Sequence, residues 1–301
     1  MAPRIVPIAA TLGAVVTDLE LARMDAATWK TVEDAFHQYA LLVFPGQHLT
    51  ESEQVAFANR FGEIELLAPD PEQKAVAISN RKPDGTLLGP DEHRFKSLRG
   101  NEGWHTDSSY MPLAAKASVL SAQVVPSTGG ETEWTDMRAA YDALDAATRE
   151  RIAGLSAHHS LYHSQAAIGH VVKPGAGYGF HTKGAPLRPL VKIHPVTGRP
   201  ALFIGRHAHA IPGLDAAESE KLLADLVDFA CRPPRTYAHR WQPGDVVIWD
   251  NRCVLHRAAP YDYREPRVMR HTRVAGDPAT ELAPTDPDAL AGAYEPSASN
   301  R

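Results

Sequence analysis

Cysteine is scarce in this 301-residue chain, which has two, Cys231 and Cys253. Neither stands in a CxxC pair or a comparable spacing, so we expect no structural zinc site and no iron–sulfur cluster held by thiolates. Two thiols in a long chain suit a reducing compartment, and the residues before Asp18 lack the long apolar run of a signal peptide. We therefore expect a cytoplasmic protein.

Blocks of Lys or Arg and long apolar runs are also missing. The formal net charge is -5, so neither nucleic acid nor an anionic membrane surface is an expected partner. No stretch reaches the roughly 20 apolar residues that a membrane-spanning helix needs. The HExxH, GxSxG and P-loop motifs are absent as well, so the chemistry has to be sought in other residues.

Short extended segments dominate the secondary structure that the sequence predicts. Each expected strand is rich in Val, Ile, Leu or aromatic residues and is bounded by Pro, Gly or Asp. These strands are residues 5–9, 41–44, 75–79, 118–125, 201–204, 236–241, 246–249 and 267–275. Helices are expected at residues 27–40 and 136–144, and after the capping boxes that begin at Thr50 and Asp215.

The order of these elements indicates the fold class. Strands do not alternate with helices as βαβ units do, so we expect a mainly β fold, a sandwich or jelly roll with added helices. One domain is expected over residues 1–276. Residues 277–301 are rich in Ala, Pro, Asp and Ser without periodicity, and we expect an extended or partly disordered tail.

Histidine, by contrast, is plentiful at 15 residues, so only spacing can locate a site. His105 and Asp107 would point to the same face of an extended strand. With the distant His256 they would supply the two imidazoles and one carboxylate of a mononuclear non-haem iron site. A bare HxD pattern also arises by chance, and His256 alone is equally compatible with a core histidine bonded to the backbone.

Basic residues alternate along the last expected strand. Arg267, His271 and Arg273 would share one face with Met269. Most strand arginines are solvated, but a row of basic groups near His256 would suit an acidic ligand. Because Arg pairs bidentately with carboxylates, Arg267 is a candidate clamp for a dicarboxylate.

Four motifs resemble the TauD/TfdA family of Fe(II)- and 2-oxoglutarate-dependent dioxygenases. They are Trp104–Asp107, Pro126–Thr132, Trp249–Arg252 with His256, and Arg267–Met269. They occur in the family's order and at compatible spacing. The resemblance implies a double-stranded β-helix (a jelly roll) with helices packed outside, and a homo-oligomer. It also implies His105, Asp107 and His256 as iron ligands, and Thr132 and Arg267 as the groups that hold the distal carboxylate of 2-oxoglutarate.

Other segments resemble the aryloxyalkanoate dioxygenases within that family. They are residues 137–145, 187–192, 204–212 and 266–269. Taurine-type members carry an Arg four residues after the oxoglutarate-binding Arg, where this chain has His271, so taurine is not the expected substrate. The resemblance implies that 2-oxoglutarate and O2 become succinate and CO2 while the carbon next to an ether oxygen is hydroxylated. The hemiacetal would collapse to a phenol and a 2-oxo acid or glyoxylate.

A substrate carboxylate needs a cationic or hydrogen-bonding partner in a mostly apolar pocket. His271 and Arg273, from the strand alternation, and Asn101, four residues before His105, are the candidates. Residues 82–98 and 162–172 are candidate lids. Two alternatives stay open: the same chemistry on an alkylsulfonate, a sulfate ester or a natural-product acid, and a cupin-like protein that holds metal without turnover.

Overall fold

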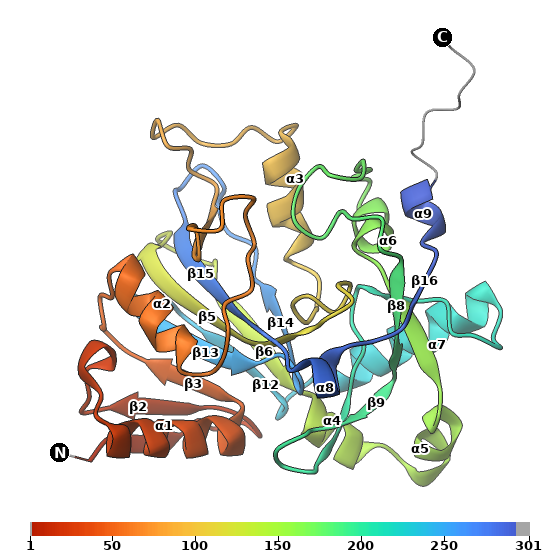
Figure 1. Ribbon diagram of the computed structural model, residues 1–301, viewed down its shortest axis with the longest axis horizontal. Helices are drawn as coiled ribbons and strands as arrows, with labels where there is room; N and C mark the ends of the chain where they lie inside the picture. Colours follow the sequence, from red (N-terminus) through yellow and green to blue (C-terminus); the bar gives the residue numbers. More distant parts are fainter. Residues whose placement is uncertain (1, 293–301) are drawn as a thin grey trace.

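A seven-stranded sheet is the largest layer of the computed structural model, which describes residues 2–292 (Figure 1). The strand order is β1-β2-β3-β13-β5-β15-β4. The β2–β3 pair is parallel and the other neighbouring pairs are antiparallel. Its strands are β1 (Arg4–Pro7), β2 (Ala14–Thr17), β3 (Leu41–Phe44), β4 (Val76–Ser79), β5 (Ala115–Val124), β13 (Val246–Asp250) and β15 (Val268–Ala275).

Both faces of this sheet are covered, which explains why β13 is an unbroken apolar run. Val246 and Ile248 pack in one core cluster with α1 (Ala26–Tyr39) and α2 (Glu51–Asn59). Val247 and Trp249 point to the opposite face and join a second cluster. The capping box predicted at Thr50 begins α2, with the Thr50 and Glu53 side chains each bonded to the other's backbone.

Smaller sheets pack on the second face. β12 (Thr236–His239), β6 (Thr132–Asp136) and β14 (Val254–Ala258) form a three-stranded sheet in that order. Trp134 of β6 meets Trp249 of β13 edge to face, with ring centroids 5.7 Å apart, so the two sheets share a core. The other strands are β11 (Ala208–His209), β7 (Ser156–His159), β8 (Ala185–Pro189) and β16 (Thr285–Asp286) in one sheet, and β10 (Pro200–Leu202) with β9 (Val191–Ile193) in another.

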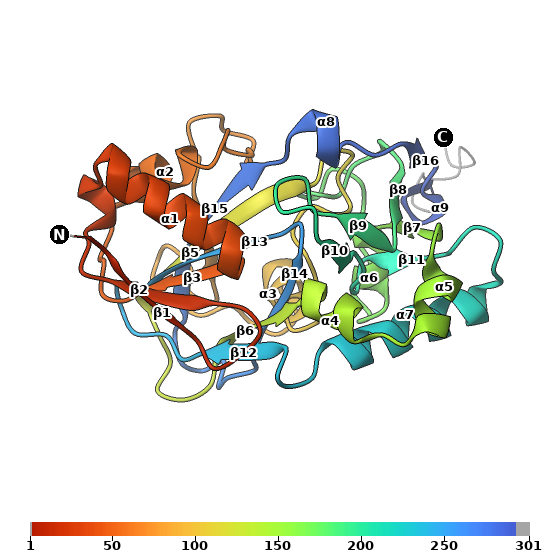
Figure 2. The same ribbon diagram turned by 90° about the horizontal axis from the view of Figure 1, so that it is seen from below.

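The helices surround these sheets. Figure 2 shows α1 and α2 beside the large sheet, with α5 (Ala146–Ile152) and α7 (Ala216–Ala230) towards the opposite side of the molecule. The remaining helical segments are η1 (Leu21–Arg23), α3 (His93–Gly100), α4 (Met137–Ala143), α5 (Ala146–Ile152), α6 (Leu161–Ala166), α7 (Ala216–Ala230), α8 (Pro278–Glu281) and α9 (Ala289–Gly292). Within residues 2–292, no helix combines the length and apolar character needed to cross a membrane.

The segment expected to be a tail contains three short elements. After β15, the chain forms α8, the strand β16 and the helix α9. β16 pairs with β8, with Thr285 opposite Pro186. Residues 293–301 of the expected tail lie outside the described residues.

Candidate metal centre

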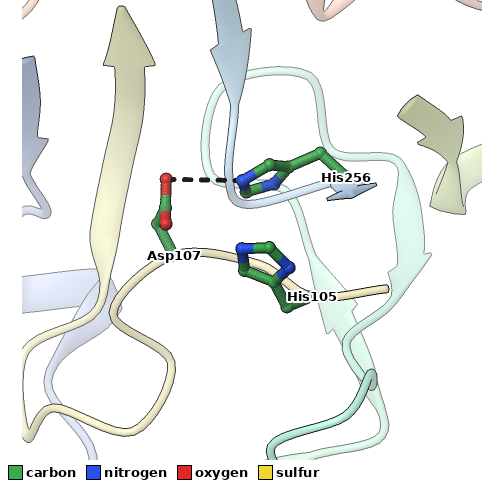
Figure 3. A group of neighbouring side chains, drawn as sticks. All are labelled: His105, Asp107 and His256. Atoms are coloured by element: carbon green, nitrogen blue, oxygen red, sulfur yellow. Dashed lines mark ion pairs between the residues drawn. The ribbon is translucent and has the colours of Figure 1, made fainter. Parts of the chain in front are cut away.

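The structure brings the three predicted ligands together (Figure 3). One donor atom from each of His105, Asp107 and His256 lies within 4.8 Å of the others, and all three residues are buried. The backbone N–H groups of His105 and His256 each donate to the other's carbonyl, at 2.9 and 2.7 Å. This bridge fixes the two imidazoles side by side, with ring centroids 4.1 Å apart.

The local geometry at Asp107 differs from the sequence prediction. His105 and Asp107 do not lie on one extended strand as expected, because His105 forms only a single bridge and a turn follows at residues 107–110. The turn places Asp107 Oδ2 at 3.7 Å from His256 Nε2. The three side chains therefore meet because a backbone bridge places the two histidines and a turn places Asp107. Alternation along a strand does not bring them together.

Neighbouring polar groups orient each ligand. His105 Nδ1 bonds to the Gly103 carbonyl at 2.8 Å, which leaves Nε2 for a metal. The Ser118 hydroxyl donates to Asp107 Oδ2 at 2.6 Å, and the Asn251 amide donates in turn to Ser118 at 2.9 Å. Arg273 Nη2 donates to Asp107 Oδ1 at 2.7 Å. Oδ2 is thus the carboxylate oxygen that faces the histidines.

The electrostatics suit a metal. Burial lowers the pKa of His105 to about 4 and holds the pKa of His256 well below its ordinary value. Burial alone would raise the pKa of Asp107, but the Arg273 charge, followed by the neighbouring histidines, holds it well below its usual range. At neutral pH the rings are neutral and the carboxylate is charged, the protonation states that a bound metal requires.

Thr132 and Arg267 form a second polar group in the same cavity. Arg267 Nη2 lies 3.4 Å from Thr132 Oγ1, and Trp241 Nε1 donates to the same oxygen at 3.0 Å. Because that oxygen already accepts two N–H groups, the hydroxyl hydrogen of Thr132 is left for a further partner. Within the described chain, no carboxylate lies within salt-bridge distance of the buried Arg267.

Gly130 permits this arrangement. Its φ is +69°, and a Cβ there would lie 3.2 Å from Arg267 Cδ. Only glycine adopts this backbone conformation readily while allowing the guanidinium so close. Arg267 Nε then donates to the Gly130 carbonyl at 3.0 Å. The turn before Thr132 therefore places Thr132 and holds Arg267.

One cavity of about 160 Å³ contains all the predicted site residues. The predicted members of its lining are Asn101, His105, Asp107, Thr132, His256, Arg267, His271 and Arg273. The rest of the wall was not among the predicted site residues and consists of Ile78, Tyr110, Leu120, Leu161, Gln165, Arg206, His207, Trp249 and Ala258.

The three candidate substrate residues have different environments. Arg273 is buried and donates to Asp107 and, at 3.0 Å, to Ser108 Oγ. His271 stacks on Trp249 with an interplanar angle of 2°, and its Nε2 lies 3.6 Å from Asp107 Oδ2. Asn101, at the C-terminal end of α3, lines the cavity wall. The side chain of Arg273 is therefore already committed to the metal centre.

Arg206 is a cation at the cavity wall that was not among the predicted substrate-binding residues. Its guanidinium donates to the backbone carbonyls of Gly100 and Ser164. Within residues 2–292 it has no salt bridge to a carboxylate, and burial lowers its pKa to about 10. Its partners come from distant parts of the chain, so no local pattern marks it.

A second buried group, His194, Asp250 and Cys253, also has donor atoms within 4.8 Å of one another. His194 Nδ1 accepts the backbone N–H groups of Val196 and Thr197, at 3.2 and 3.1 Å. The Nε2–H therefore donates to Asp250 Oδ2 at 3.0 Å. Arg252 occupies both oxygens of Asp250 as well. These groups satisfy one another, and we read the cluster as structural.

Residues 4–273 match the family model described as "Taurine catabolism dioxygenase TauD, TfdA family". The chain belongs to this family, a conclusion that agrees with the four motifs and with the clustered His105, Asp107 and His256.

Two relatives and one solved structure are similar to this chain over most of its length. The (S)-phenoxypropionate/alpha-ketoglutarate-dioxygenase of Sphingobium herbicidovorans is 55% identical over 285 residues, covering 93% of this chain and 97% of the relative. The alpha-ketoglutarate-dependent 2,4-dichlorophenoxyacetate dioxygenase of a Burkholderia species is 39% identical over 264 residues, 84% and 87% of the two chains. The crystal structure of AAD-2 in complex with Mn(II) and N-oxalylglycine superposes with a TM-score of 0.85 at 37% identity, covering 95% of this chain and 100% of AAD-2.

Proposed function

We propose that the protein is an Fe(II)- and 2-oxoglutarate-dependent dioxygenase acting on an aryloxyalkanoate. It would hydroxylate the carbon next to the ether oxygen, and the products would be a phenol, a 2-oxo acid or glyoxylate, succinate and CO2. The observation that carries the proposal is one cavity that holds both the His105–Asp107–His256 cluster and, beside Thr132, the buried Arg267, which has no carboxylate partner among residues 2–292.

The donor set fits ferrous iron. Two neutral imidazoles and one carboxylate, with the rest of the surroundings open to the cavity, are the ligands of non-haem iron oxygenases. Bound iron would supply the oxygen activation that couples 2-oxoglutarate oxidation to substrate hydroxylation. The chain's own contribution is to orient the ligands through Gly103, Ser118 and Arg273.

Thr132 and Arg267 would bind the distal carboxylate of 2-oxoglutarate. A buried guanidinium without a counter-ion favours an anionic ligand strongly, because burial weakens water's screening. The free hydroxyl hydrogen of Thr132 adds a second donor beside it. N-Oxalylglycine, bound to the related AAD-2, has the 2-oxoglutarate skeleton with NH in place of one CH2, which supports this cosubstrate.

The substrate carboxylate would be held by Arg206 and Asn101. Arg273, a predicted candidate, already donates to Asp107 and Ser108, whereas Arg206 carries a buried charge that has no acidic partner in the described part of the chain. The apolar side chains of Ile78, Leu120 and Leu161 line the same cavity and suit an aryl ring. The relatives named for (S)-phenoxypropionate and 2,4-dichlorophenoxyacetate support this class of acid.

The remaining proposals concern the whole chain. We read the large sheet and the β12-β6-β14 sheet as the two halves of a double-stranded β-helix, in one domain over residues 1–276. Cys231 and Cys253 are both free thiols, which supports a cytoplasmic location. A homo-oligomer stays a proposal drawn from the family.

A substrate panel tests the reaction. Succinate release with Fe(II) and O2 would be measured for an aryloxyacetate, both enantiomers of 2-aryloxypropionate, a sulfate ester and taurine. We expect release with an aryloxyalkanoate and none with taurine. Succinate release with the sulfate ester alone would support the same reaction on a different class of substrate. No release with any of these compounds would favour a protein that binds metal without turnover.

A further inference from the structure

A buried polar chain links the metal centre to a loop outside it. Arg273 Nη1 donates to Ser108 Oγ at 3.0 Å, and the Ser108 hydroxyl donates to Glu65 Oε2 at 2.9 Å. The Tyr178 hydroxyl donates to the other oxygen, Glu65 Oε1. The Ser108 and Tyr178 hydroxyls also lie 2.8 Å apart. Arg273 joins this network to the metal centre, because its Nη2 donates to Asp107 Oδ1.

Glu65 and Arg273 are held together at two levels. The Glu65 backbone N–H donates to the Arg273 carbonyl at 2.8 Å. The side chains also approach, with Arg273 Nε 4.0 Å from Glu65 Oε2, and only 13% of the Glu65 side chain is exposed. Burial raises the pKa of Glu65, while Arg273 and the two hydroxyls oppose that rise and favour the carboxylate. The guanidinium therefore lies between two carboxylates, Asp107 on one side and Glu65 on the other.

Tyr178 brings the loop of residues 167–184, which joins α6 to β8, into this network (the green loop beside α6 in Figure 1). The Arg273 guanidinium lies over the Tyr178 ring, 5.5 Å from its centroid. The next residue, Gly179, has φ +85°, and a Cβ there would lie 2.5 Å from Tyr110 and 2.6 Å from Leu161. The loop is thus fitted closely against two residues that line the cavity.

The backbone conformation of Ser108 directs its side chain into the network that joins Arg273 to Glu65. Its φ is +54°, a left-handed conformation that costs a non-glycine residue free energy. The turn directs the Ser108 hydroxyl to Arg273 and Glu65 while the preceding residue, Asp107, faces the histidines. A strained serine directly after a ligand is explained if the hydroxyl has to meet both groups.

We propose that Glu65 and Tyr178 are positioning residues of the metal centre, acting through Arg273 on Asp107. They hold the guanidinium so that it bonds Asp107 Oδ1 and leaves Oδ2 facing the histidines. Glu65 also offsets the Arg273 charge, which would otherwise repel a metal cation. This inference rests on the proposed metal site.

Mn(II) binding to the full-length, metal-stripped protein tests the inference, with free Mn(II) followed by electron paramagnetic resonance and no cosubstrate present. Glu65→Gln should weaken Mn(II) binding about tenfold, as expected for a group that orients a ligand, and Tyr178→Phe should weaken it in the same direction by less. Tyr263→Phe is the matched control, because it also removes a tyrosine hydroxyl bonded to a glutamate, Glu102, at 2.6 Å. This control should bind like the parent protein.

Two outcomes separate this inference from the proposed function. If the parent protein binds Mn(II), His105→Ala does not, and both network variants bind within about twofold of the parent, the positioning role is refuted and the metal site stands. If the parent protein itself fails to bind Mn(II), the proposed function fails first. Melting temperatures of all variants are measured alongside, and Tyr178→Phe, a change in a half-buried loop, decides the case if Glu65→Gln does not fold.

Discussion

At the scale of single residues, what the site can bind depends on which donor and acceptor atoms its side chains have not already used. His105 uses Nδ1 on a backbone carbonyl, Thr132 accepts two N–H groups, and Arg267 lacks an acidic partner in the described chain. Each of these side chains therefore still has an atom that can bind a metal or donate a hydrogen bond, and all three side chains line one cavity. The unused donors and acceptors define what the cavity can bind: a metal at one end and a carboxylate at the other.

Removing a ligand should abolish metal binding. We expect His105→Ala and Asp107→Ala to lose more than about 100-fold in Fe(II) affinity, beyond the loss typical for groups that only orient a ligand, and to lose succinate release. Calorimetric titration under anaerobic conditions measures this. His209→Ala is the control, since His209 does not line the cavity. Unchanged affinity in both ligand variants would refute the metal assignment.

Thr132 should act on the cosubstrate. Thr132→Val removes one hydrogen bond to a charged group, worth about 1.5–3 kcal/mol, so KM for 2-oxoglutarate should rise at least about tenfold while KM for the acid substrate changes little. Thr135→Val is the matched control on the same strand, because the Thr135 hydroxyl donates to the Ala230 carbonyl, away from the cavity. Equal KM values in the two variants would contradict the assignment.

At the scale of elements, local pattern predicted some parts and missed others. β13 and α2 were predicted because an apolar run and a capping box are local signals. β6, with the sequence Thr-Glu-Trp-Thr-Asp, was missed because its strand identity depends on pairing with β12 and β14. The His105 segment was assigned as a strand, whereas its conformation depends on His256, far along the chain. The three residues predicted as ligands from motif order do lie together, and their geometry depends on these distant pairings.

The α2 cap gives a test at this scale. Thr50→Ala removes the capping box and should lower the free energy of unfolding by about 1 kcal/mol. α2 also anchors the large sheet, since Gln54 Nε2 donates to the Arg270 carbonyl at 3.0 Å. Urea denaturation measures the loss, with Thr31→Ala, an exposed residue of α1, as the control. A loss no larger than in the control would show that the capping box does not stabilise the folded protein.

At the scale of the whole molecule, buried histidines make stability depend on pH. Burial holds the pKa of His159 well below 6.5, and neither ring nitrogen has a hydrogen-bond partner within the described residues. Below about pH 6.5, His159 binds a proton in the unfolded chain but not in the folded chain. The stability from this residue is therefore full above that pH and falls as the pH falls. The slope is about 1.4 kcal/mol per pH unit for each such histidine.

His159→Leu should therefore reduce the pH dependence by up to one proton. Urea denaturation of the parent protein and the variant at pH 7.5 and 5.5 measures it, and the variant should lose less stability between the two. Because leucine also places an apolar group beside Phe203, whose ring centroid lies 5.7 Å from that of His159, the variant should remain folded. Identical losses in both proteins would contradict the burial argument.

The central claim is that one cavity uses iron, 2-oxoglutarate and O2 to hydroxylate an aryloxyalkanoate. The most direct test is mass spectrometry of the products after reaction under ¹⁸O2 with 2-phenoxypropionate. One oxygen atom of O2 enters the new carboxylate of succinate and the other enters the substrate, so we predict succinate carrying one ¹⁸O, formed one-to-one with phenol, and none of either from His105→Ala. Phenol released without labelled succinate, or succinate without ¹⁸O, would contradict the account.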